Sequence, residues 1–231
     1  MSTSVVLLAY NEAENLRILL PQIQNILEKM ELDFEILVID SAQPTDNTEE
    51  VCQANGARYL PQEEPHYAGA FRTGIRAAEK ERILVLDADG SHNPKDIPAL
   101  HRKFDEGYDM VIGSRYVEGG KTNDAKSSIM MSKLLNGVMR MVVGVKARDI
   151  STSYRLYDAK QLKAVQLTRT NYEVLQEVIL RLRLNNPSFT IGEVPIEFNK
   201  RMFGESKRQL FKFICGYIST VFRLIGMRVK G

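Results

Sequence analysis

The chain has little of what marks secreted, metal-clustered or membrane-spanning proteins. It contains two cysteines in 231 residues, Cys52 and Cys215, and their separation fits neither a disulfide framework nor a metal-ligand spacing. No apolar run approaches the roughly 20 residues that span a bilayer. Strand-like sequence begins almost at Met1, with no leader-like segment before it. We therefore expect a protein that folds in the reducing cytoplasm.

The net charge is small as well. A formal value of +2 excludes a globally basic nucleic-acid-binding protein, so anions have to be attracted by local clusters of charge. Hydrophobic residues make up 44% of the chain, which is enough to bury the core of one large α/β domain with an appended piece. We expect no nucleic-acid partner.

Apolar runs alternate with helical patterns along the first half of the chain. Expected strands cover 4–9, 34–39, 57–60, 83–86 and 110–112, and expected helices cover 12–30, the stretch from the turn at 44–46 to residue 54, 68–80 and 95–106. This alternation predicts an α/β fold with a mostly parallel sheet, helices on both faces and right-handed crossovers.

Beyond residue 113 we expect helices over 128–143 and 172–184 and a strand over 190–198. The stretch 128–143 is rich in Met and Leu. We expect it to pack in the core, because Met fills irregular gaps, with a surface that meets something apolar as the alternative.

Two carboxylates follow the expected strand at 83–86, in Asp87-Ala88-Asp89-Gly90-Ser91. Ligands of α/β sheets bind beyond the carboxyl ends of the strands, so this pair lies where a site is expected. In an extended chain both side chains would point to one side, about 7 Å apart at the Cα atoms. That spacing allows them to share one hard divalent cation. The alternative is a solvated turn, because Asp and Gly are common turn formers.

Further segments are expected at the same edge of the sheet. They are Ala9-Tyr10-Asn11-Glu12, Asp40, Gly113-Ser114-Arg115-Tyr116, Asp149 to Arg155, and Arg201 with Gly204 to Lys207. A carboxylate at the end of an early strand suits a ribose hydroxyl or a base edge, although a helix cap explains Glu12 and Asp40 equally well. Arg and Lys in such loops suit phosphate groups, with solvated surface charge as the alternative for each one.

Taken together, these segments resemble the family 2 glycosyltransferases, and within them the polyprenyl-phosphate (dolichyl-phosphate) mannose synthases. The resemblance also includes Ser91-His92, Val117 before Gly119-Gly120, and Gly192 to Ile196, and it extends to Lys207. It implies a GT-A fold over 1–207 and transfer of a hexose, most closely mannose from GDP-mannose, to a polyprenyl monophosphate. A UDP-hexose donor such as UDP-glucose, or a non-catalytic lipid-binding subunit, is the alternative. The absence of Trp disfavours the processive polysaccharide synthases.

The resemblance implies a role for each site residue. Asp87, Asp89 and the position of Ser91 would surround Mg²⁺ or Mn²⁺ that also touches the donor diphosphate, and Asp89 and Arg115 would act directly in catalysis. The nucleotide sugar would be bound by Ala9, Tyr10, Glu12, Asp40, Asp87, Arg201 and Lys207, and the acceptor phosphate by Ser132, Asp149, Ser153 and Arg155.

The chain departs from the family pattern in four places. Ser41 follows Asp40 where the family usually has a second acidic residue, which affects base recognition. Tyr154 stands where Gly is usual, and Ser91 stands where some members have Gln. Ser128 replaces an Arg, and Lys126 is a candidate for the missing charge.

The implied reaction needs no dedicated general base, because a phosphate monoester with a second pKa near 6 is already largely ionised at neutral pH. The site must instead gather several negative charges, which calls for a cation, Arg and Lys. We therefore expect structural or surface roles for His66, His92 and His101. For His92, a hydrogen bond to a phosphate is the alternative.

Apolar and basic residues alternate at helical spacing over 208–231. Such a helix suits the surface of an anionic membrane, where a lipid acceptor resides, and packing on the domain or on a partner is the alternative. Because Arg223 interrupts the apolar stretch, we expect the helix to lie on the bilayer. The protein is then expected to be peripheral at the cytosolic face of a membrane.

Overall fold

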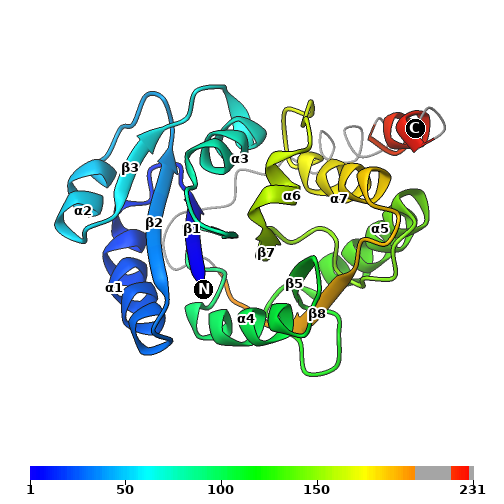
Figure 1. Cartoon of the computed structure of the whole chain (residues 1–231), viewed down its shortest axis with the longest axis horizontal. Helices are drawn as coiled ribbons and strands as arrows, with labels where there is room; N and C mark the ends of the chain where they lie inside the picture. The colour runs from blue at the N-terminus through cyan, green and yellow to red at the C-terminus, as the bar shows by residue number, and fades with distance from the viewer. Residues whose placement is uncertain (201–219, 229–231) are drawn as a thin grey trace.

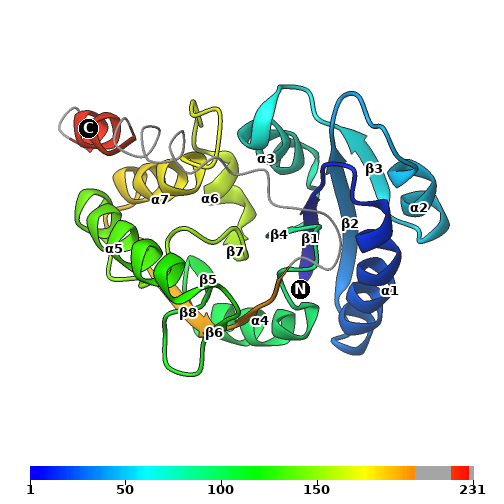
Figure 2. The same cartoon turned by 180° about the vertical axis from the view of Figure 1, so that it is seen from behind.

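The structure is a computed structural model that describes residues 1–200 and 220–228. Arg201, Lys207 and most of the expected C-terminal helix lie outside the described residues. The centre is a seven-stranded sheet in the order β3-β2-β1-β4-β7-β5-β8 (Figures 1 and 2). Its strands are β1 (Ser2–Leu8), β2 (Asp33–Asp40), β3 (Arg58–Pro61), β4 (Arg82–Asp87), β5 (Met110–Ser114), β7 (Arg155–Asp158) and β8 (Ile191–Pro195).

One strand runs against the others. β7 is antiparallel to both β4 and β5, whereas the remaining neighbours pair in parallel. The carboxyl ends of β1, β2, β4 and β5 therefore meet at one edge of the sheet, and the amino end of β7 meets them there. The predicted mostly parallel α/β sheet is confirmed.

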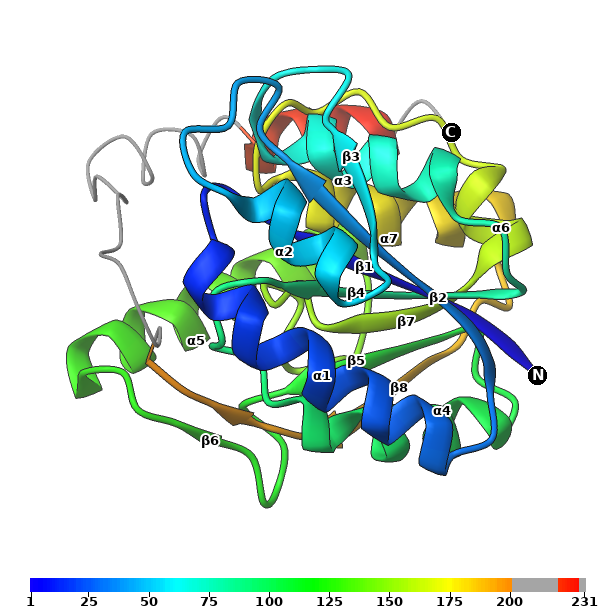
Figure 3. The same ribbon diagram turned by 90° about the vertical axis from the view of Figure 1, so that its left-hand side faces the viewer.

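Helices cover both faces of the sheet, as predicted (Figures 1 and 3). One face carries α1 (Ala13–Lys29), α2 (Thr48–Ala54) and α4 (Ile97–Asp105), and the other carries α3 (His66–Ala77), α6 (Ala159–Lys163) and α7 (Val174–Asn185). A short 3₁₀ turn, η1 (Pro94–Asp96), precedes α4.

The spacing of apolar residues in the sequence explains how the layer of α1, α2 and α4 packs on the sheet. In α1, Leu16, Leu20 and Ile23 recur at helical spacing and are fully buried. They pack with Val5 and Leu7 of β1, whose alternate residues face the other layer.

Three short elements of the C-terminal half were not predicted, namely β6 (Lys121–Thr122), β7 and α6. β7 and α6 have only four and five residues, and β7 begins with a charged side chain, so neither produces a clear periodic pattern. The single strand expected over 190–198 divides into β8 and β9 (Glu197–Phe198), and β9 pairs with β6 (Lys121–Thr122). The division follows Pro195, which has no N–H to donate to a ladder.

The prediction that 128–143 packs in the core is wrong. This stretch forms α5 (Lys126–Val143), which projects away from the sheet (Figure 3). Only Asn136, Met139 and Val143 of the helix are buried. Met130 is 73% exposed, Leu134 64% and Met141 71%. The alternative, a surface with apolar side chains, describes α5 correctly.

The described part of the C-terminal helix, 220–228, packs on its own chain beside α5 and α7 (Figures 1 and 2). Leu224 is fully buried in the same hydrophobic cluster as α7, and Arg228 Nη1 donates to the carbonyls of Met141 (2.9 Å) and Val142 (3.0 Å). A cation at the last carbonyls of α5 is favourable for the helix dipole. Phe222 remains 70% exposed. Within the described part of the chain, no helix is long and apolar enough to span a bilayer.

This packing predicts different costs for two residues of the helix. Leu224→Ala removes a fully buried side chain and should lower the free energy of unfolding by about 2–5 kcal/mol. Phe222→Ala removes an exposed one and should change it by about 0.5 kcal/mol or less. Urea denaturation measures both. Equal effects of the two substitutions would contradict the observed packing.

Candidate active site

The residues predicted to form a site come from several segments that meet at the carboxyl edge of the sheet. Ala9 follows β1, Asp40 ends β2, Asp87 ends β4 and Arg115 follows β5. The loop that precedes β7 reaches the same edge because β7 runs in the opposite direction. One short antiparallel strand thus delivers residues 149–154 to the ends of the parallel strands.

The turn that carries the two carboxylates is compact. The chain leaves β4 at Asp87 and turns at Ala88 and Asp89, so the extended geometry expected for the pair is wrong. Gly90 has φ +77°, a conformation that glycine adopts without strain. Asp89 is 6% exposed, and its Oδ1 accepts hydrogen bonds from the backbone N (3.0 Å) and Oγ (2.6 Å) of Ser91. Ser91 therefore orients the carboxylate of Asp89.

The donor set of this turn fits one kind of metal site. The described residues contain no group of three or more His, Cys, Asp and Glu side chains that could hold a metal ion. Mg²⁺ does not need such a group, because it is usually bound by one or two carboxylates together with substrate phosphates and water. Asp87 and Asp89 supply those carboxylates. The hydroxyl of Ser91 donates to Asp89 and so orients that carboxylate. Its oxygen keeps lone pairs after this donation, so the role of Ser91 as a ligand stays a prediction.

The segments after β1 and β2 form the side expected to bind the nucleoside. Asp40 is fully buried, and its Oδ1 accepts from the backbone N of Ser41 (2.7 Å) and of Asn11 (3.3 Å). Burial raises the pKa of Asp40, although these two hydrogen bonds act in the opposite direction. Tyr10 is 57% exposed beside it. The ring of Tyr10 is thus open to solvent, whereas the carboxylate of Asp40 shapes the backbone around it.

The loop between β2 and α2 is tied to the start of α1 by Asp46, which the sequence analysis placed in the turn before the expected helix but not at the site. Asp46 Oδ2 accepts from the backbone N of Ala13 (3.0 Å), and its Oδ1 accepts from the N and Oγ1 of Thr48. The spacing of Asp46 and Thr48 is a turn and cap signal that predicts the contact with Thr48, whereas the contact with Ala13 depends on the tertiary structure. Glu12 precedes α1, and its Oε2 accepts from the side chain of Asn15.

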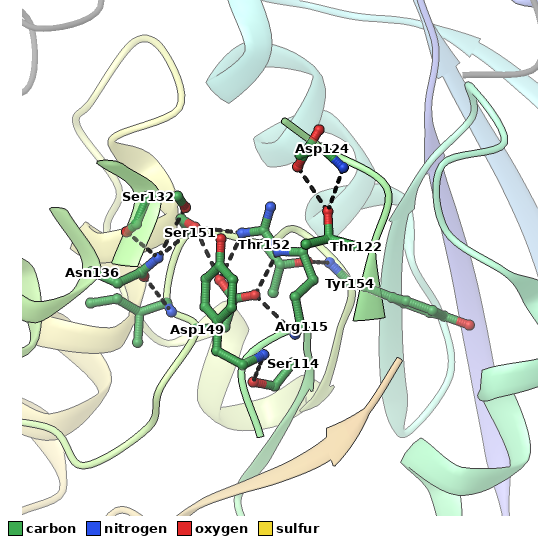
Figure 4. Close-up of polar contacts among 12 residues, drawn as sticks. Ser114, Arg115, Thr122, Asp124, Ser132, Asn136, Asp149, Ser151, Thr152 and Tyr154 are labelled. Carbon is green, nitrogen blue, oxygen red and sulfur yellow. Dashed lines mark hydrogen bonds and ion pairs between the residues drawn. The ribbon is translucent and has the colours of Figure 1, made fainter. Parts of the chain in front are cut away.

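On the side of the site formed by the end of β5 and the loop before β7, Arg115 and Asp149 form a bidentate ion pair (Figure 4). Arg115 Nε lies 2.7 Å from Asp149 Oδ2, and Nη2 lies 2.9 Å from Oδ1. The backbone N of Arg115 donates to the same carboxylate at 3.1 Å. The side chain of Asp149 is fully buried and that of Arg115 is 11% exposed. Two parallel bonds fix the guanidinium plane as well as its position.

Other residues hold this pair in place. Glu193 of β8 accepts hydrogen bonds from the backbone N of Arg148 (2.8 Å) and of Asp149 (3.1 Å). Ser151 Oγ accepts from Arg115 Nη2 (2.8 Å) and donates to Asp149 Oδ1 (3.0 Å). Asn136 of α5 accepts from the backbone N of Ile150 at 2.9 Å (Figure 4). The sequence analysis assigned no role to Glu193, Ser151 or Asn136.

The ion pair shifts the titration of both partners. Burial on its own would raise the pKa of Asp149, but the hydrogen bonds and charge of Arg115 outweigh it, so the pKa lies below the ordinary carboxyl value. Burial likewise opposes the charge of Arg115, and Asp149 more than compensates, so the pKa of Arg115 is raised. Both groups are therefore charged at neutral pH. Arg115 Nη1 has no hydrogen-bond partner among the described residues.

Aromatic rings and a lysine surround Arg115. Its guanidinium carbon lies 5.0 Å from the ring centre of Tyr116 and 5.1 Å from that of Phe198. Lys133 Nζ of α5 lies 5.4 Å from the Tyr116 ring. Lys133 is therefore an α5 cation close to the pair, and the charge expected from Lys126 stays a prediction. Ser132 is partly buried, and its Oγ accepts from Asn136 Nδ2 at 3.5 Å.

Arg155 is not placed for the direct phosphate contact expected of it. The residue is fully buried, and its guanidinium donates to the carbonyls of Thr152 (2.7 Å), Leu175 (2.7 Å) and Ile150 (2.8 Å). Those carbonyl dipoles stabilise and orient the buried charge, so Arg155 stabilises the loop before β7. Ser153 is 4% exposed in the same loop.

Comparison with known proteins gives one family. The sequence model described as "Glycosyl transferase family 2" matches residues 4–165. A dolichol-phosphate mannosyltransferase of Pyrococcus furiosus is 30% identical over 97% of this chain, which spans 64% of that protein's length. A polyprenol monophosphomannose synthase of Mycolicibacterium smegmatis is 32% identical over 89% of this chain and 80% of the relative.

Solved structures share the fold at lower identity. Glucosyl-3-phosphoglycerate synthase from Mycobacterium tuberculosis, crystallised with Mn²⁺, UDP and glucosyl-3-phosphoglycerate, superposes with a TM-score of 0.75 and 20% identity over 97% of this chain and 80% of that one. Mannosyl-3-phosphoglycerate synthase from Rubrobacter xylanophilus superposes with a TM-score of 0.76 and 17% identity, over 100% of this chain and 74% of that one. The predicted GT-A fold is confirmed.

The buried ion pair predicts a pH-dependent contribution to stability. Asp149→Asn leaves Arg115 without its counter-charge and should cost about 3–5 kcal/mol at pH 7. Because the folded pKa of Asp149 is lowered, its stabilisation is complete above the unfolded value of about 3.9 and is lost as the pH falls through the folded pKa. Denaturant unfolding at pH 7 and pH 3 should therefore show a smaller cost at pH 3. An equal cost at both pH values would contradict this account.

Proposed function

The chain belongs to family 2 of the glycosyltransferases, and we propose that it transfers a hexose, most closely mannose from GDP-mannose, to a polyprenyl monophosphate with inversion at the anomeric carbon. The family match confirms the predicted family and the prediction that the chain is a glycosyltransferase. One observation carries the proposal of an anionic donor and an anionic acceptor. The carboxylates of Asp87, which ends β4, and of Asp89 lie at the same edge of the sheet as a pre-oriented arginine after β5.

The donor side of the proposal uses the ends of β1, β2 and β4. Ala9, Tyr10, Glu12 and Asp40 bind the nucleoside, and Asp87 and Asp89 hold Mg²⁺ or Mn²⁺, with Ser91 orienting Asp89. A divalent cation bound there supplies positive charge to the donor diphosphate. Arg201 and Lys207, which lie outside the described residues, complete the proposed contacts to the nucleotide sugar.

The acceptor side of the proposal uses Arg115 and α5. Arg115 keeps Nη1 for the lipid phosphate while Asp149 holds its other nitrogens. Because Asp149 already neutralises one positive charge, Lys133 supplies a second cation near Tyr116. Ser132 contributes a hydroxyl from the same helix. Asp149 and Arg155, which face Arg115 and backbone carbonyls, act as positioning residues, as does the loop that contains Ser153.

The proposed step forms a bond between a phosphate oxygen of the acceptor and the anomeric carbon of the hexose. The bond from that carbon to the donor diphosphate breaks, and its electron pair leaves with the nucleoside diphosphate. The acceptor is largely ionised at neutral pH, so no protein base has to remove a proton. Arg115 orients the acceptor phosphate through a hydrogen bond, and Lys133 and the divalent cation supply the net positive charge, in a site whose donors are already oriented.

We also propose that the protein is peripheral at the cytosolic face of a membrane. The exposed apolar side chains of α5 and of the helix over 220–228 lie on neighbouring elements, which Arg228 connects. They are Met130, Met131, Leu134, Met141, Phe222 and Ile225. Exposed Lys126, Lys133 and Arg223 are close to them in sequence and carry the charge that attracts anionic lipids.

A transfer assay tests the proposed reaction. Labelled GDP-mannose, UDP-glucose and other UDP-hexoses are each incubated with a polyprenyl phosphate, with and without a chelator, and labelled lipid is measured. We expect product from GDP-mannose that the chelator abolishes. If product forms only from a UDP-hexose, then the donor is that UDP-hexose and not GDP-mannose. No metal-dependent lipid product from any hexose donor would refute the proposal.

Substitution of Asp89 tests the assignment of the metal. Asp89→Ala should reduce kcat/KM by about 100-fold or more, because a bound cation stabilises charge by several kcal/mol. Asp33→Asn is the matched control, since Asp33 begins β2 at the opposite edge of the sheet and pairs there with Lys80. Full activity of Asp89→Ala would rule out this metal site.

Sedimentation with vesicles of phosphatidylglycerol and phosphatidylcholine tests the membrane surface. The pair Met130→Ser and Leu134→Ser should weaken binding by tenfold or more, because each buried apolar side chain contributes about 1.5–3 kcal/mol. Ile18→Ser, at a 40% exposed position of α1, is the control and should not weaken it. Unchanged binding of the double variant would exclude this surface of α5.

A further inference from the structure

His92 is buried directly behind the metal-binding turn. Its side chain is 1% exposed, and its Nδ1 accepts a hydrogen bond from the backbone N of Asp87 at 3.1 Å. Because Nδ1 is an acceptor, the ring proton of the neutral imidazole resides on Nε2. That nitrogen lies 3.5 Å from Thr152 Oγ1, in the loop that leads to β7. The two ring nitrogens therefore face different halves of the site.

The faces of the ring are occupied as well. Tyr154 stacks on His92 with ring centres 4.9 Å apart, and the ring of Phe198 lies at 64° to that of His92 with centres 5.5 Å apart. Phe198 also forms a β-bridge with His92 and carries the guanidinium of Arg115 above its ring. On the metal side, the backbone N of Asn199 donates to the carbonyl of Ser91 at 2.9 Å. One imidazole thus contacts the donor turn, the acceptor loop and the ring under Arg115.

We propose that His92 is a positioning residue that fixes the Asp87–Ser91 turn against the acceptor loop through its Nδ1 acceptor. Asp87 is the last residue of β4, so the direction in which its carboxylate leaves the sheet depends on where its own N–H is held. Hydrogen-bond partners behind metal ligands typically change metal affinity by about 10–100-fold when they are removed. The proposal rests on the metal-dependent function proposed above. It assigns His92 no contact with either substrate.

Amide substitutions separate the role of Nδ1 from that of the buried ring. In His92→Asn the side-chain oxygen is at the same distance along the chain as Nδ1 and can accept from the Asp87 N–H. In His92→Gln the oxygen is one bond further, closer to the position of Nε2. His92→Phe keeps an aromatic ring between Tyr154 and Phe198 but removes the acceptor. His101→Phe is the matched control, because His101 is a 3% exposed histidine of α4 whose ring nitrogens have no partner among the described residues.

The measured quantity is the affinity for Mn²⁺, followed by the EPR signal of the free ion, with the protein alone and with GDP or UDP added. We expect His92→Phe and His92→Gln to bind Mn²⁺ about 10-fold to 100-fold more weakly than the wild type. His92→Asn should remain within about threefold of it, and His101→Phe should not differ. Thermal unfolding of each variant confirms that it is folded.

Equal Mn²⁺ affinities of the Asn and Gln variants, or an unchanged affinity of His92→Phe, would overturn the role of His92 while leaving the metal site intact. Asp89→Asn in the same titration distinguishes failure of the metal assignment from failure of the role of His92. If the wild type binds Mn²⁺ no better than Asp89→Asn, then both the metal assignment and the role of His92 fail.

Discussion

The arrangement of the site depends on the ion pair between Arg115 and Asp149. It joins the end of β5 to the loop before β7 through three hydrogen bonds to one buried carboxylate. Glu193 accepts a hydrogen bond from the backbone N of Asp149, and Phe198, which forms a β-bridge with His92, supports Arg115 from the side of the Asp87–Ser91 turn. An arginine fixed in this way needs little reorganisation when an anion arrives, which is the condition under which electrostatic stabilisation is most effective.

The ion pair also limits the net positive charge that Arg115 can offer to the proposed acceptor phosphate. A carboxylate that neutralises Arg115 leaves little net positive charge for a lipid phosphate, so the neighbouring Lys133 becomes important to the proposed mechanism. On the donor side, two carboxylates add negative charge to a place where a diphosphate is expected to bind. A divalent cation between them resolves that conflict. One half of the site thus offers positive side chains to an anion, whereas the other offers carboxylates to a cation. His92 contacts both halves.

The sequence predicted the layered α/β fold well, because the strands in its first half are long apolar runs and helices such as α1 have a clear period. It missed β7, whose four residues carry no such pattern and whose direction depends on its neighbours in space. The same limit applies to the site. Arg155 follows the family's motif, but only tertiary structure reveals that backbone carbonyls surround its guanidinium. Likewise, the apolar residues of α5 suggest a core helix until the fold places it at the surface.

The central claim is that this site gathers charge and does not transfer a proton. The most direct test is the pH dependence of kcat/KM for the acceptor, measured with a polyprenyl phosphate and with a phosphonate analogue of higher second pKa. The account predicts that activity rises through the second pKa of the acceptor, near 6 for a phosphate monoester, and that the midpoint moves upward with the analogue. A midpoint that stays at the same pH for both acceptors would identify a protein base and contradict the account.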